Sequence, residues 1–186
     1  FWLQQGRFML EATPTYAKDD FFIRAKGQIL AHIDEIPGEE AIDTDDAWFK
    51  FGIWDCFDIQ VGRYEAWEVY NKGQGLERDT LEDLGAFDGP NIYEINYAFY
   101  RQNGFGQAAL HLFPTNYLRF ELGSVFGNEL GFNSVGVRPV AIAELGMVKV
   151  KLAAEWRKLT HQEDDKKQEE EKRGFGGSLQ LLAGEL

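Results

Sequence analysis

The chain has 186 residues, a length that suits one domain. Aromatic residues make up 15% of it, and it contains 20 glycines but only 5 prolines, which favours β-structure with many turns. The formal net charge of −12 opposes binding to nucleic acid, so we expect no nucleic-acid partner. No run of about 18 apolar residues occurs, so the sequence predicts no membrane-spanning helix.

The first residues already fit a strand. The chain begins at Phe1 without methionine, and residues 6–12 have strand character. We therefore expect the chain to be a piece of a longer protein rather than a protein from which processing has removed a leader.

Residues 21–33 give the clearest strand pattern. Their odd positions are apolar and their even positions are mostly polar, and this alternation recurs at residues 47–53, 57–62, 118–123, 148–157 and 175–183. Residues 21–33 and 146–158 exceed the about 5–6 residues of a typical strand, and a tilted transmembrane strand needs about 9–11. Residues 107–113 and 135–144 fit less well, the second because it contains Pro139, but we predict strands there too.

The connections between these strands are alternately short and long. Short turns are predicted at residues 54–56, 113–116 and 144–146, and longer loops at residues 34–46, 64–105, 127–133 and 159–173. This order is typical of outer-membrane barrels. The sequence thus predicts an all-β fold over residues 1–186: an antiparallel transmembrane β-barrel, or part of one, with short periplasmic turns and longer external loops.

Aromatic residues lie near the predicted strand ends. They are Trp48, Trp54, Tyr64, Trp67, Tyr117, Phe126 and Trp156. Amphipathic rings favour the membrane interface, where barrels have aromatic girdles.

Charges are divided between the strands and the long loop. The polar strand faces predict a pore lining of Arg24, Lys26, Lys50, Arg119, Glu121, Lys149, Lys151, Glu155 and Arg157. Residues 64–105, predicted to fold into the lumen, supply a constriction of Glu65, Glu68, Glu77, Asp79, Glu82 and Asp83. A basic wall facing an acidic loop sets ion selectivity in a channel. The other interpretation is that the basic residues are ordinary solvated strand faces.

The sequence contains no recognisable catalytic or metal-binding motif. His32, His111 and His161 are far apart, the single cysteine cannot form a cysteine-based zinc site, and no glycine-rich phosphate loop occurs. We therefore predict a protein that is not an enzyme and that has no cofactor, no catalytic residues and no metal site.

Several stretches resemble a known family. Residues 46–52 (DAWFKFG) and 58–65 (DIQVGRYE), with residues 117–122 and 152–157, are similar to proteobacterial outer-membrane porins of the substrate-selective (phosphate- or carbohydrate-selective) type. The resemblance implies the bacterial outer membrane as location, its lipid as a partner, a larger and often trimeric barrel, and an eyelet formed by the long loop. The arginine ladders of phosphate-selective members have no counterpart in this acidic loop.

The sequence therefore predicts a porin-like channel for passive diffusion of small hydrophilic solutes, either ions or sugars. One alternative is a soluble all-β carbohydrate-binding module. Another is a structural barrel with a plugged lumen. A soluble module would fold without detergent, whereas a plugged barrel would share the fold but conduct no ions.

Overall fold

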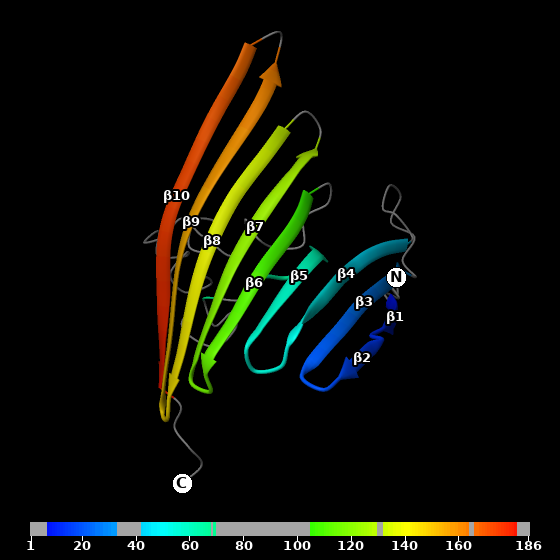
Figure 1. The fold of residues 1–186 in the computed structure, drawn as a ribbon. Helices are drawn as coiled ribbons and strands as arrows, with labels where there is room; N and C mark the ends of the chain where they lie inside the picture. Colours follow the sequence, from blue (N-terminus) through cyan, green and yellow to red (C-terminus); the bar gives the residue numbers. More distant parts are fainter. Residues whose placement is uncertain are drawn as a thin grey trace, which may run out of the picture.

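The computed structural model describes residues 7–32, 42–67, 69, 105–129, 132–163 and 166–181, and these residues are all-β. They form ten strands in one antiparallel sheet (Figure 1). The strands are β1 (Arg7–Ala12), β2 (Thr15–Lys18), β3 (Phe21–His32), β4 (Ile42–Ile53), β5 (Phe57–Arg63), β6 (Phe105–Thr115), β7 (Leu118–Glu129), β8 (Phe132–Leu145), β9 (Val148–Glu163) and β10 (Lys166–Leu181).

Strands that follow one another in the chain are also neighbours in the sheet. The order is β1-β3-β4-β5-β6-β7-β8-β9-β10, and the short β2 pairs with β3 beside β1. Among the described residues β1 and β10 do not pair with each other, so the sheet is open. The antiparallel all-β prediction is confirmed at this level.

Tight turns join the strands at one end of the sheet, the lower end in Figure 1. They lie at residues 19–20, 54–56, 116–117 and 146–147. Asp19, Asp55 and Gly146 have positive φ angles of 53°, 56° and 63°. This left-handed backbone is what a tight hairpin turn requires, and aspartate and glycine tolerate it best.

Two of the predicted long loops are wrong. Residues 127–133 are mostly strand, because β7 extends to Glu129 and β8 starts at Phe132. Residues 159–173 are also mostly strand, because β9 runs to Glu163 and β10 starts at Lys166. Charge density suggested a solvated loop, but cross-strand pairing of opposite charges is compatible with a long hairpin.

The other two predicted loops differ in outcome. The first is shorter than residues 34–46, since β4 already begins at Ile42. The second, residues 64–105, lies mostly outside the described residues, apart from residues 64–67, Val69 and the first residue of β6.

Pro139 lies inside β8, as the pattern predicted. Pro139 pairs with Leu122 of β7, but the β8–β9 ladder passes from Val137 to Val140 and is interrupted at residues 138 and 139. Proline has no N–H to donate to a ladder, which accounts for the interruption on this side.

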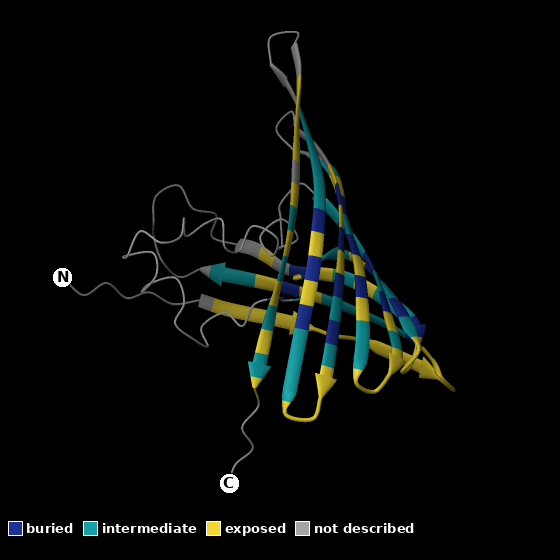
Figure 2. Cartoon of the chain, turned by 90° about the vertical axis from the view of Figure 1, so that its left-hand side faces the viewer, coloured by how far each residue is buried: buried dark blue, intermediate teal, exposed yellow. Residues whose placement is uncertain are grey.

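The two faces of the sheet differ in character. Buried and exposed residues alternate along the strands (Figure 2). Directly paired residues share a face, so the register defines an apolar face that includes Phe21, Phe49, Val61, Leu112, Leu122, Val137, Leu152 and Leu179. The opposite polar face includes Arg24, Lys50, Asp58, Gln60, Gln107, His111, Glu121, Arg138, Lys151 and Glu155.

Burial is inverted relative to polarity. All eight apolar-face residues named above are exposed, whereas Asp58, His111, Glu121 and Arg138 are buried. No helix among the described residues is long and apolar enough to cross a membrane.

Candidate functional site: the polar face of the sheet

The nine charged residues predicted to line a pore lie together on the polar face. Arg24 is in register with Lys50, and the pairing continues through Gln60 and Ala109 to Gly123 on β7. Arg119 and Glu121 have the same parity as Gly123, and Ile142 connects Arg119 with Lys151 on β9. The remaining members, Lys26, Lys149, Glu155 and Arg157, follow by the period of two.

The predicted constriction acids are only partly within the described structure. Glu65 is the second residue after the end of β5 and is exposed. Glu68, Glu77, Asp79, Glu82 and Asp83 lie outside the described residues. The constriction itself therefore stays a prediction.

The chain after β5 turns across the polar face. We call residues 64–67 and Val69 the inward segment. The Tyr64 N–H donates to Gln107 Oε1 of β6 at 3.3 Å, and the Ser178 hydroxyl of β10 donates to the Val69 carbonyl at 2.6 Å. The inward segment thus reaches from β6 to β10.

A small apolar cluster fixes the far end of the inward segment. Val69 is completely buried and packs with Val140, Ile142 and Ala153 of β8 and β9, and Trp67 packs against this group. Val140, Ile142 and Ala153 are apolar residues on the otherwise polar face of β8 and β9. Burying them explains why the segment lies against β8 and β9.

A buried ionic cluster lies against Trp67. His111 of β6 has one ring nitrogen, Nδ1, 2.5 Å from Asp58 Oδ1 and the other, Nε2, 3.2 Å from Glu121 Oε2. Arg138 Nη1 donates to Glu121 Oε1 at 3.3 Å. We call Asp58, His111, Glu121 and Arg138 the His111 cluster; they come from four consecutive strands, β5 to β8.

The His111 cluster binds the backbone of the inward segment on both sides of one residue. The Trp67 N–H donates to Glu121 Oε2 at 3.1 Å, and the Trp67 carbonyl accepts from Arg138 Nη2 at 2.8 Å. The indole ring also stacks on the His111 imidazole, with centroids 4.7 Å apart and planes inclined by 15°. The His111 cluster therefore positions Trp67 through its backbone N–H, its backbone carbonyl and its indole ring.

Tyr64, at the start of the inward segment, is also buried. Desolvation and the nearby carboxylates of Glu121 and Asp58 raise the pKa of the Tyr64 hydroxyl well above its usual range. Tyr64 is therefore neutral at physiological pH and adds no charge to the polar face.

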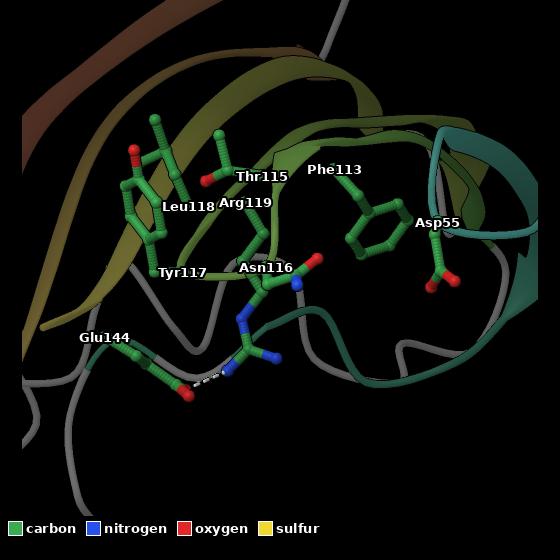
Figure 3. Close-up of a pocket in the computed structure, with 8 residues that line it drawn as sticks. All are labelled: Asp55, Phe113, Thr115, Asn116, Tyr117, Leu118, Arg119 and Glu144. Carbon is green, nitrogen blue, oxygen red and sulfur yellow. Dashed lines mark hydrogen bonds and ion pairs between the residues drawn. The ribbon is translucent and has the colours of Figure 1, made fainter. Parts of the chain in front are cut away.

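A shallow pocket of about 130 Å³ lies at the turn end of the polar face (Figure 3). Arg119 pairs there with Glu144 at 2.6 Å, and Lys149 reaches the same carboxylate oxygen at 2.7 Å. The Arg119 guanidinium also lies over the Trp67 ring, 5.5 Å from its centroid. Arg119, at the turn end of this face, is thus also in contact with the inward segment.

The polar face offers no evident metal site in the part of the chain that the structure describes. In the His111 cluster the carboxylates approach the two ring nitrogens rather than a common point. A metal ion needs ligands that converge, so the arrangement suits an internal ion-pair network.

The sequence indicated some members of the cluster and missed others. Glu121 was predicted to line the pore, whereas His111 and Arg138 were not. Their signal was parity: His111 continues the alternation Gln107, Ala109, and Arg138 lies between Val137 and Pro139, which are both exposed on the outward face. For Arg138 this alternation was obscured, because the residues around Pro139 are partly apolar on both faces of the strand.

No protein-family model, curated protein or solved structure matches this chain. The resemblance to substrate-selective porins therefore stays a prediction that rests on the sequence stretches alone.

Proposed function

We propose that this chain forms part of the wall of an outer-membrane β-barrel channel through which small hydrophilic solutes diffuse passively. The observation that carries the proposal is the inversion of the two faces: large side chains of the apolar face are exposed, whereas charged side chains of the polar face such as Asp58, Glu121 and Arg138 are buried. A soluble sheet packs its apolar face in a core. A membrane barrel turns that face to lipid and encloses the polar one.

The size of the apolar face supports a lipid environment. Large side chains are exposed on strands from β3 to β10, including Phe49 at 43%, Leu122 at 51% and Leu152 at 58%. Soluble monomers rarely expose contiguous apolar patches larger than a few hundred Å². Lipid chains would cover such a face without a second protein layer.

The apolar face also ends where a membrane would end. On β9 it runs over residues 148–156, roughly 27 Å at about 3.3 Å per residue. Beyond Trp156 the same face becomes charged: Lys158 pairs with Glu169 at 2.7 Å, and the Trp156 indole N–H donates to Glu171. A tryptophan at the border between apolar and charged surface is typical of an interfacial girdle.

The polar face suits the wall of a water-filled passage. Its cations are combined with acids, such as Lys26 with Asp46 at 2.9 Å and Lys50 with Asp58 at 3.5 Å. Mixed, paired charges attract ions of either sign and leave sugars able to pass, so the wall favours no single solute class. The acidic loop residues outside the described structure remain the proposed selectivity element.

The proposal is tested with the full-length protein in detergent micelles and liposomes. We expect heat-modifiable gel mobility, which indicates a folded barrel, followed by steady single-channel conductance in a planar bilayer. A monodisperse protein that folds in water without detergent would contradict the proposal and favour the soluble carbohydrate-binding module. Folding into liposomes without conductance would favour the plugged barrel instead.

A further inference from the structure

We propose that His111 holds the inward segment in place as a doubly protonated imidazolium, so that removing one proton from His111 displaces Trp67. If the chain is a channel, as proposed above, the position of the segment in the passage then depends on pH. The inference about Trp67 does not require conductance.

Hydrogen-bond chemistry gives the first reason. A neutral imidazole has one N–H donor and one acceptor nitrogen. Here both nitrogens lie within hydrogen-bonding distance of ionisable carboxylates, Asp58 at 2.5 Å and Glu121 at 3.2 Å. An ionised carboxylate has only acceptors, so both contacts are favourable together only when both nitrogens carry protons.

Other charged and titratable groups surround the two carboxylates that contact His111. Lys50 approaches Asp58 from β4, Arg138 approaches Glu121 from β8, and the Tyr64 hydroxyl lies near both acids. With a neutral imidazole the cluster would have two cations and two anions. The second proton is therefore required by the contacts of both ring nitrogens with carboxylates, not by an excess of negative charge.

Glu121 couples the imidazole to the inward segment. Its carboxylate accepts from His111, Arg138 and the Trp67 N–H, and all of these contacts are buried or part-buried. Loss of the Nε2 proton places a lone pair against Glu121 Oε2. The repulsion moves either the carboxylate, which anchors the Trp67 backbone, or the imidazole, on which the indole stacks. Both movements displace Trp67.

Arg119 of β7 is a further charge that faces Trp67. It is paired with Glu144 near the turn and does not contact His111 in the described structure. A change in His111 protonation therefore reaches Trp67 through Glu121 and the stacked ring rather than through Arg119.

The test uses full-length protein folded in detergent, with ¹⁵N-labelled histidine. Replacing His32 and His161 with glutamine one at a time assigns the three histidine signals. We titrate from about pH 5 to about pH 9, the range in which histidine changes charge in proteins. The position of Trp67 is followed in parallel as the fluorescence difference between the native protein and Trp67→Phe.

We expect two protonated ring nitrogens for His111 at the acidic end, and a Trp67 fluorescence change that follows the loss of one proton. Glu121→Gln should move both transitions together to lower pH by about one unit, because a carboxylate next to the imidazolium is lost. Asp58→Asn should act in the same direction from the other side of the ring. The control Glu169→Gln, on the charged end of β10, should change neither.

Two results would overturn the inference: a single protonated nitrogen on His111 throughout the titration, or a Trp67 signal that does not follow the His111 titration. If one of the two cluster variants fails to fold, the other still decides. Absence of conductance with a coupled titration would contradict the channel proposal alone.

Discussion

At the scale of single residues, the ion pairs on the polar face should differ in how much they stabilise the folded protein, because some are buried and others are exposed. The side chains of Glu121 and Arg138 are at most 1% exposed, whereas those of Arg119 and Glu144 are each more than a third exposed. Breaking a buried pair leaves an uncompensated charge, while exposed pairs contribute little. The two arginines on the same face should therefore respond very differently to the same substitution.

Arg138→Met should lower the free energy of unfolding by roughly 3–5 kcal/mol, because Glu121 loses a buried partner and the Trp67 carbonyl loses its donor. The matched change Arg119→Met should cost less than about 1 kcal/mol. Urea unfolding in detergent or vesicles measures both. Equal losses would mean that Arg138 is not the buried anchor described above.

Leu122 on the apolar face provides a second residue-scale prediction. It lies on β7 between Phe120 near the turn and Phe126, and all three are exposed on the same side. If lipid covers this face, Leu122→Arg should destabilise the folded state by about 2–4 kcal/mol, as for arginine near a bilayer midplane. Phe120→Arg, closer to the interface, should cost less in the same vesicle unfolding assay. Near-zero costs for both would place this face in water.

At the scale of elements, the β9–β10 hairpin combines two environments on one pair of strands. Residues 148–156 have an apolar outward side, and the hairpin beyond Trp156 has charged residues on that side, including Lys158, Glu169 and Glu171. We infer that the hairpin crosses the membrane with its lower part and projects into water with its upper part.

Cysteine scanning tests this border in a Cys56→Ser background, because Cys56 is itself exposed. In liposomes, Leu152→Cys should not react with a water-soluble maleimide, whereas Glu169→Cys should react rapidly. Lys149→Cys, half-buried on the polar face, should also react if water fills the passage. A reactive Leu152→Cys would show that the apolar face is not covered by lipid.

At the scale of the whole molecule, the arrangement of charge on the two sides of the wall should determine selectivity. Lys149 and Lys158 lie on the same strand but on opposite faces, since β9 alternates with a period of two. Only Lys149 faces the proposed passage. The pair therefore separates a lumen effect from a general effect of net charge.

Lys149→Glu should shift the reversal potential in a salt gradient towards cation preference, because charged side chains along a pore set its ion selectivity. Lys158→Glu makes the same change in net charge on the outward side and should leave the reversal potential unchanged. Single-channel recordings of both variants decide. Identical shifts would show that the polar face does not line the conducting path.

The sequence by itself determined the all-β class, most strand positions from residue 21 onward and the shared face of the nine charged strand residues named in the sequence analysis. It did so because a period of two is a local property: parity alone places Arg24, Lys50 and Lys151 on one side. Local patterns were misleading at residues 159–173, where charge density suggested a loop and cross-strand pairing extended the hairpin instead.

Only the tertiary structure decided which of these residues meet. Asp58 and His111 are 53 positions apart in the chain, and Val69 and Ser178 are 109 positions apart. No local pattern encodes such contacts, because they depend on the strand order and on the direction in which the chain leaves β5. Burial of Val69 and Trp67 against β8 and β9 draws the inward segment across the polar face, and that places Trp67 on the His111 cluster.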